Sequence, residues 1–335
     1  MKKVNKGLIV TAALIILAAV ISVAALLPRG NDFPETVGVD SPLVSERAYN
    51  VLLIGTDREA GLADVMMLAR LDLAAKRASI MQIPRDTYAE YTNGSYKKLN
   101  GAYSVLGAQG MCDFLGEAFG ICIDRYIVTG LDTVRNAVDA IGGVDVNIPC
   151  DMKYRDKSQD LYIDLKAGLQ HLDGDAVEQF LRFRSGYIEG DIDRMDAQKL
   201  FLAASAKKIK DEFSPALAYR LLEAADGIET NFSASELLNI ALETAGIGSE
   251  NVTVLTMPGA EARAASGASY YSISKKAASS VAKSFFGADS GELDREGKFL
   301  NEQNASFRNV YNGYTEYKAY TLADIAQNGV EIDLK

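Results

Sequence analysis

The longest apolar run in the chain lies near its N-terminus, where residues 7–27 carry no charged side chain. A run of that length predicts a helix that spans a lipid bilayer. Lys2, Lys3 and Lys6 precede the run, and basic residues stay on the cytoplasmic side, so the rest of the chain is predicted to lie outside the cell membrane. The apolar core is longer than that of a cleavable signal peptide and continues into Pro28, which favours an uncleaved, single-pass anchor.

Beyond this run, short apolar stretches alternate with polar ones. Strands are predicted at residues 49–55, 65–73, 77–84, 125–130, 144–149 and 251–258. Helices are predicted at residues 99–107, 110–120, 131–141 and 272–286, and the stretch from 191 to about 246 is mostly helical in pattern. The last forty residues show no strong period. Strands that alternate with helices in this way indicate an α/β layered body.

These patterns divide the chain into five parts. We expect a cytoplasmic tail at residues 1–6, a transmembrane anchor at 7–27, a polar linker at 28–47, an extracytoplasmic domain at 48–289 and an extension of unknown role at 290–335. No internal repeat is visible in the sequence.

The charge of the chain argues against nucleic acid as a partner. The chain has 45 acidic and 35 basic residues, and three of the basic ones precede the anchor. The part beyond the anchor therefore carries 32 basic residues and a formal charge of −13. Phosphate backbones are held by basic surfaces, which such a composition disfavours.

The cysteines and the single histidine carry little chemical signal. Cys112, Cys122 and Cys150 lack the CxxC and Cys/His spacings of zinc sites. A disulfide between Cys112 and Cys122 stays open, because both flank a predicted helix. His171 lies in a turn-like stretch, GLQHLDGD, without a serine or cysteine motif that would suggest a catalytic relay.

Arginines gather in one run, VEQFLRFRSGYIEGDIDRMDAQKLF, although the chain as a whole is acidic. If a helix begins near Asp191, then Asp191, Arg194 and Gln198 lie on one face of it. A carboxylate is favoured at a helix N-terminus, where free backbone N–H groups point outward. Arg182 and Arg184 share a face only if the chain there is extended, so the preceding helix is predicted to end just before Arg182.

Such a run has an ordinary explanation as well, since solvated charges on a surface helix are common. Two further stretches favour a site. Asp57 follows the first strand and Asp64 precedes the second, so both carboxylates are predicted at one sheet edge, as oxygen ligands for Mg²⁺. Arg85 follows the third strand, and Lys98 in KKLN is a further candidate for a phosphate contact.

Seven motifs follow one another in the chain: VLLIGTD with a following AD pair, SIMQIPRDTY, KKLNGAY, VDAIGGVDV, LKAGLQHLDGDAV, RFR and GDIDRMDAQ. In this order they resemble the LytR-CpsA-Psr family of cell-wall phosphotransferases. The resemblance runs from about residue 49 to 209 and continues more weakly to about 286. It implies an α/β fold with three layers, α/β/α, around a central mixed sheet.

The resemblance also implies a role for each candidate residue. In that family the first-strand Asp and the following loop Asp hold Mg²⁺, with Mn²⁺ as the alternative, which here means Asp57 and Asp64. The residues that match the polyprenyl-pyrophosphate contacts are Arg85, Arg182, Arg184, Arg194 and Gln198. The residue that matches the general base is Asp191. Arginine suits such a site because its planar fork binds phosphate oxygens in pairs.

The function that the resemblance implies is transfer of a glycopolymer, such as a teichoic acid or a capsule, from undecaprenyl pyrophosphate to peptidoglycan, at the muramic-acid 6-hydroxyl. A lipid-linked donor and a wall acceptor meet at the outer membrane face, which agrees with the predicted anchor. Two alternatives stay open: hydrolysis of the lipid-linked intermediate by the same residues, and a non-enzymatic role in polymer binding or regulation.

The sequence departs from the family pattern at several positions. The loop between Asp57 and Asp64 is short, and Ser185 and Ala197 stand where relatives often have His and Arg. Asp193 stands where relatives have Gly. A carboxylate there would either raise the pKa of Asp191 or point to solvent.

Overall fold

The computed structural model describes residues 48–335 apart from 58–60, 93–94, 158–160, 189, 213, 226, 234–235, 238–239, 241–243, 245–246, 265, 289–292, 300–308 and 311–316. The predicted tail, anchor and linker at residues 1–47 lie outside this part of the chain. Within it, no helix combines the length and the apolar character that crossing a bilayer requires.

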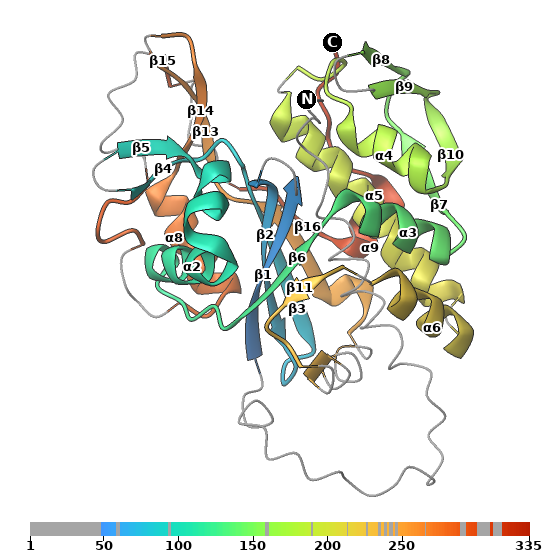
Figure 1. The fold of residues 1–335 in the computed structure, drawn as a ribbon, viewed down its shortest axis with the longest axis horizontal. Helices are drawn as coiled ribbons and strands as arrows, with labels where there is room; N and C mark the ends of the chain where they lie inside the picture. Colours follow the sequence, from blue (N-terminus) through green and yellow to red (C-terminus); the bar gives the residue numbers. More distant parts are fainter. Residues whose placement is uncertain are drawn as a thin grey trace, which may run out of the picture.

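A mixed sheet of seven strands forms the centre of the molecule, in the order β11-β6-β1-β2-β3-β12-β16 (Figure 1). Its strands are β1 (Ala48–Asp57), β2 (Leu62–Asp72), β3 (Arg77–Ile83), β6 (Arg125–Thr129), β11 (Glu229–Thr230), β12 (Val252–Thr256) and β16 (Ala319–Thr321). β6 and β12 run parallel to their neighbours β1 and β3, and the other pairs are antiparallel. The predicted α/β fold with a central mixed sheet is confirmed.

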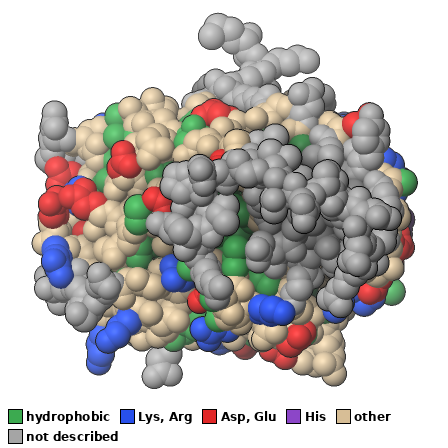
Figure 2. Space-filling model, turned by 90° about the horizontal axis from the view of Figure 1, so that it is seen from below, with side chains coloured by type: hydrophobic (Ala, Val, Ile, Leu, Met, Phe, Trp, Pro, Cys, Tyr) green, Lys and Arg blue, Asp and Glu red, His purple; other side chains and the backbone are tan. Residues whose placement is uncertain are grey.

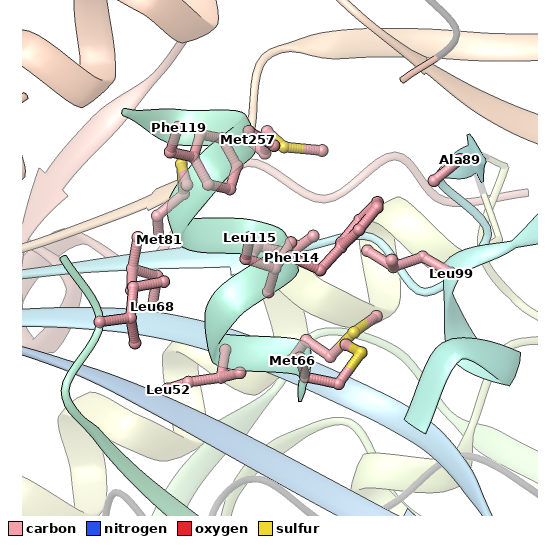
Figure 3. Packing of buried hydrophobic residues seen from close by; sticks show 14 of the residues in the cluster. Leu52, Met66, Leu68, Met81, Ala89, Leu99, Phe114, Leu115, Phe119 and Met257 are labelled. Carbon is pink, nitrogen blue, oxygen red and sulfur yellow. The ribbon is translucent and has the colours of Figure 1, made fainter. Parts of the chain in front are cut away.

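Both faces of the central sheet are buried, because its strands alternate their apolar side chains between two clusters. Leu52 and Ile54 belong to one cluster, whereas Val51 and Leu53 belong to the other. The first cluster is covered by α2 (Ala102–Phe119) and α8 (Lys275–Phe285), and Figure 3 shows its packing. The second is covered by α5 (Asp191–Glu212) and α9 (Leu322–Asn328).

A third cluster lies on the far side of α5, to the right in Figure 1. Its elements are α3 (Leu131–Ala140), β7 (Val144–Ile148), β8 (Met152–Asp156), β9 (Leu161–Leu165), β10 (Gly168–Leu172), α4 (Gly174–Arg182) and α6 (Pro215–Ala224). β7 pairs with β10, and β8 pairs with β9, each in a separate two-stranded sheet. The α5 helix therefore contributes to two cores, which fixes its position firmly.

Small hairpins complete the opposite end, at the left in Figure 1. They comprise β4 (Tyr88–Thr92), β5 (Ser95–Lys98), β13 (Gly259–Arg263), β14 (Ser269–Ile273) and β15 (Asn309–Val310). Elsewhere in the described part of the chain, short 3₁₀ helices lie at Leu99–Gly101, directly after β5, and at Ser249–Asn251, directly before β12. The N–H of Tyr271 on β14 donates to the carbonyl of Asp86 at 2.9 Å. These hairpins are thereby tied to the segment that follows β3.

Most of the predicted elements are present, with two corrections. His171 was expected in a turn, but it lies in β10, where its ring contacts Asp145 at 2.7 Å. The helix before the arginine pair includes Arg182 as its last residue. Cys112 and Cys122, whose pairing the sequence left open, are not joined by a disulfide in the structure. The two short helices predicted before residue 120 are present as α2, which Gly107 interrupts with a φ of 66°.

Candidate active site

Charged side chains converge where the β1–β2 hairpin, the segment after β3 and the start of α5 meet. On the face seen in Figure 2, by contrast, acidic and basic side chains are dispersed among other residues. Asp64, like Arg194, is almost completely buried. The register of β1 and β2 passes from Gly55–Val65 to Thr56–Ala63, so Asp64 occupies a β-bulge. Bulges commonly redirect a side chain next to an active site.

Arg85 connects the hairpin to the helix. It lies two residues beyond the end of β3, and its Nη1 lies 2.8 Å from Asp64 Oδ1. Its Nε lies 3.5 Å from Asp191 Oδ1 and 3.9 Å from Asp86 Oδ1. Asp86 in turn accepts a hydrogen bond from Lys98 Nζ at 2.7 Å. The guanidinium group of Arg85 thus contacts both Asp64, the predicted metal ligand, and Asp191, the predicted general base.

Asp191 is the point at which the arginines meet. Its Oδ1 lies 2.9 Å from Arg194 Nη2 and 3.5 Å from Arg184 Nη2, in addition to its contact with Arg85. The predicted start of the helix near Asp191 and the i, i+3 neighbourhood with Arg194 are confirmed. Neither carboxylate oxygen accepts a well-aligned hydrogen bond from the described residues. The Asp191 carboxylate is therefore held in place by the charges of the arginines, and its oxygen lone pairs can still accept a proton.

The electrostatics of the group favour an anionic ligand. Burial alone would raise the pKa of Asp191, but the charges of Arg194, Arg85, Arg184 and Lys98 outweigh it and hold that pKa below its ordinary value. Burial and the neighbouring Arg194 lower the pKa of Arg184 to about 9. Burial is the larger cause, and the repulsion between the two arginines adds to it; a bound phosphate would offset both effects.

Asp193 does neither of the two things that its sequence position suggested. The pKa of Asp191 is lowered, and the charges with the largest effect on it are those of basic residues. Asp193 is buried rather than solvated, with 3% of its surface exposed. Its Oδ1 accepts a hydrogen bond from the backbone N–H of Asp333 at 3.2 Å.

Three sequence candidates are not seen at the centre of the group. Arg182 lies on α4, where its Nη1 donates to Glu178 at 2.8 Å, so the helix rather than the expected extended chain directs its side chain. Gln198 is buried beneath Arg194 on α5 and accepts a hydrogen bond from Gln82 at 3.3 Å. The backbone of Asp57 ends β1 opposite Leu62, but its side chain lies outside the described atoms.

A buried polar network under the group was missed by sequence analysis. Gln82 on β3 donates to the carbonyl of Met195 at 3.0 Å and lies 3.4 Å from the hydroxyl of Thr256. That hydroxyl accepts from Lys199 Nζ at 2.9 Å, and Lys199 is paired with Asp196. The network joins β3, β12 and α5 beneath Arg194. A lysine on the buried face of a helix was the available signal for it.

The residues present fit a divalent cation. Asp64 is buried, and its Oδ2 has no hydrogen-bond partner among the described residues. Burial also raises the pKa of Asp64, against the opposing effect of Arg85. Mg²⁺ is commonly bound through one or two carboxylates together with substrate phosphates. Although the described side chains contain no group of three or more such ligands, an orphaned carboxylate oxygen next to arginines suits this mode of binding.

Comparison with known proteins gives a family match. The sequence model of the LytR_cpsA_psr family matches residues 30–286, which is most of the chain. TagV of Bacillus subtilis, a polyisoprenyl-teichoic acid–peptidoglycan teichoic acid transferase, is 27% identical over 240 residues. That match covers 68% of this chain and 61% of TagV. The chain thus spans about three fifths of the length of this relative.

Solved structures agree with the fold. The crystal structure of B. subtilis TagV superposes with a TM-score of 0.62 at 25% identity, over 72% of this chain and 97% of that one. A structure of TagT bound to LI-WTA has a TM-score of 0.59 at 19% identity, over 78% of this chain and 98% of that one, and supports the fold alone.

Proposed function

We propose that this chain, which belongs to the LytR-CpsA-Psr family, transfers a phosphorylated glycopolymer from a polyprenyl-pyrophosphate carrier to a hydroxyl group of peptidoglycan. The observation that carries the proposal is Asp191, a carboxylate at the start of α5 in contact with three arginines. The name of TagV, a teichoic acid transferase, supports the same reaction class. Undecaprenyl is the carrier we expect, and teichoic acid is one of the polymers that fit.

In this proposal the arginines bind the donor pyrophosphate. Arg85, Arg184 and Arg194 present N–H groups on one side of Asp191, and phosphate oxygens compete for them. Phosphoryl transfer depends mainly on such positioning and charge stabilisation. The depressed pKa of Arg184 would return toward its ordinary value when the anion arrives.

Asp191 takes the proton of the attacking hydroxyl group. The acceptor oxygen forms a bond to the phosphorus that carries the glycopolymer, while the bond from that phosphorus to the bridging oxygen breaks and polyprenyl phosphate leaves. A depressed pKa keeps Asp191 ionised at neutral pH, as a base must be. Because the donor draws the arginines toward its phosphates, the pKa of Asp191 rises when the donor binds, which strengthens the base.

The metal belongs to the same proposal. Asp64, with Asp57 at the end of β1, would hold Mg²⁺ or Mn²⁺, which would supply positive charge to the donor phosphates. Lys98 would act from the rim through Asp86, at a point where a substrate phosphate could displace the carboxylate. Residues 7–27 would keep the site at the outer face of the cell membrane, close to donor and wall.

Two variants distinguish the arginines of the RFR motif. We expect Arg184→Ala to lower kcat/KM for the donor by about 10²-fold, because its guanidinium reaches Asp191. Arg182→Ala should cost less than about 10-fold, because Arg182 is paired with Glu178 within one helix. Steady-state kinetics with a synthetic polyprenyl-pyrophosphate glycoside measure both, and equal losses would contradict the assignment.

Asp64→Asn tests the metal site. The variant keeps the side-chain shape but loses the charge of the buried carboxylate, so the Mg²⁺ concentration for half-maximal activity should rise at least ~10-fold. Asp145→Asn is the matched control, since Asp145 is an exposed carboxylate on β7 that lies 2.7 Å from His171 Nδ1. Activity that persists in EDTA would exclude a metal site at Asp64. The same would follow if Asp64→Asn, Asp145→Asn and the parent protein all needed the same Mg²⁺ concentration for half-maximal activity.

The reaction itself is tested with the full chain in detergent, the synthetic donor, Mg²⁺ and peptidoglycan oligomers, with products identified by mass. A glycan joined to the oligomer through a phosphodiester would support transfer. If only free glycosyl phosphate forms, hydrolysis becomes the function. If the donor binds without turnover under any condition, a polymer-binding or regulatory role replaces both.

A further inference from the structure

We propose that residues 333–335 act as a positioning element for the segment 183–190, which carries Arg184 and leads directly into Asp191. The inference rests on the proposed function for its kinetic consequence, but its structural part can be measured without any reaction. It assigns a role to the last residues of the chain, where the sequence shows no motif.

The two segments are joined by an isolated antiparallel β-bridge and the hydrogen bonds that flank it. The N–H of Ile188 donates to the carbonyl of Asp333 at 2.9 Å, and the N–H of Lys335 donates to the carbonyl of Gly186 at 3.0 Å. Tyr187 and Leu334 lie opposite one another as a β-bridge. Lys335 adds a side-chain bond from its Nζ to the carbonyl of Ser185 at 2.9 Å. Every described residue from 185 to 188 thus lies against 333–335.

A further hydrogen bond ties 333–335 to the catalytic helix itself. The N–H of Asp333 donates to Asp193 Oδ1 at 3.2 Å, and Asp193 lies two residues after the proposed base. The acceptor Asp193 is buried, so this bond reaches from the exposed Asp333 into the interior at the start of α5. The unusual carboxylate at position 193 is explained by this contact. Residues 333–335 therefore contact both the segment before Asp191 and the helix after it.

The residues that precede the pairing segment are fixed elsewhere. β16 pairs with β12 in the central sheet, and α9 packs on the second cluster beside α5. Ile332 packs against the third cluster, on the other side of α5. Residues 333–335 thus follow a stretch of chain that is itself packed against the body of the protein.

The segment 183–190 needs such support. Its described residues form neither helix nor extended strand. Its buried residue Tyr187 packs its ring edge-on against that of Phe183, with 5.3 Å between the ring centroids. Arg184 lies 3.5 Å from Asp191 across this turn. Small displacements of a catalytic group can cost up to ~100-fold in rate. Loss of the pairing should therefore weaken both donor binding and turnover.

Proline substitutions at adjacent positions provide a matched test. In this register the bonds flank the Tyr187–Leu334 pair, so the N–H of Leu334 points away from the segment, whereas that of Lys335 is bonded to it. Proline lacks an N–H donor. Lys335→Pro should therefore disrupt the pairing, and Leu334→Pro should spare it. Lys335→Ala tests the side-chain hydrogen bond to Ser185 separately, because it removes Nζ and keeps the backbone N–H.

The first readout is hydrogen exchange of the Ile188 amide in the full chain in detergent. We expect deletion of 333–335 to accelerate it at least ~10-fold with no change in the amides of β1 and β2, and Leu334→Pro to leave it near the parent value. The second is binding of inorganic pyrophosphate, whose Kd should rise ~10-fold in Lys335→Pro and stay within twofold in Leu334→Pro. The third is kcat/KM for the donor, which should follow the same order.

Unchanged exchange after deletion would overturn the proposal, as would equal effects of the two prolines on exchange or pyrophosphate binding. Equal loss in Lys335→Ala and Lys335→Pro would also overturn it as stated, because the side chain alone would then account for the contact. If the parent protein transfers nothing, the proposed function fails, yet exchange and pyrophosphate binding still decide whether 333–335 position the segment.

Discussion

Asp191→Asn is expected to lower kcat by roughly 10²–10⁴-fold, the contribution of a general base to a proton-transfer step. Asparagine has nearly the same shape, but its amide cannot take the proton of an attacking hydroxyl group. The four basic side chains that lower the pKa of Asp191 would all remain. The measurement is the rate of phosphodiester formation at saturating donor and acceptor.

Binding separates this role from that of a phosphate contact. Asp191 competes with the donor for Arg85, Arg184 and Arg194, so its neutralisation should leave the affinity for inorganic pyrophosphate unchanged or increase it. A fully active Asp191→Asn variant, or one that loses pyrophosphate binding in proportion to rate, would show that Asp191 is not the base.

Arg85→Gln should have an effect of similar size, with kcat/KM about 10²–10³-fold lower, because it removes a guanidinium that contacts both Asp64 and Asp191. Arg135→Gln is the control: this partly exposed arginine on α3 pairs with surface carboxylates. Steady-state kinetics measure both variants. Equal losses in both, with reduced thermal stability, would indicate a general structural effect.

The same variant predicts a shift in pH dependence. Asp191 acts when ionised, so activity should fall as pH falls through its pKa. In the parent that pKa lies below the ordinary carboxyl value, since arginine charges outweigh burial. Removal of Arg85 weakens this effect, so the acidic limb of kcat/KM should move to higher pH. A limb at the same pH in both proteins would show that another group titrates.

The hydrophobic pattern was sufficient to predict most strands of the central sheet and the long helices that cover it. β1, β2 and β3 are buried on both faces and therefore read as continuous apolar runs. The small hairpins β4–β5, β8–β9 and β13–β14 were missed, because their strands are short and partly exposed, with weak alternation. β16 and α9 lie in a stretch without a strong period, and only tertiary pairing shows their place.

Individual site positions show a similar division. Asp191 and Arg194 could be placed from helix spacing, since i and i+3 share a face. Asp64 was predicted just before a strand, but it lies within β2 at a bulge, and a bulge depends on the register of two strands. The direction of the Arg182 side chain was predicted wrongly, because α4 ends one residue later than expected. Helix boundaries cannot be read from sequence to within a single residue. The contact between Asp193 and Asp333 joins residues 140 positions apart, beyond any local pattern.

The most direct test of the account is to run the reaction in water enriched in ¹⁸O, with synthetic donor, Mg²⁺ and peptidoglycan oligomers. If a sugar hydroxyl attacks the phosphorus, as proposed for Asp191 and its arginines, the oligomer-linked phosphodiester and the released polyprenyl phosphate will both lack ¹⁸O. Glycosyl phosphate that contains one ¹⁸O atom, formed without linked product, would show that water is the acceptor and would contradict the transfer proposed here.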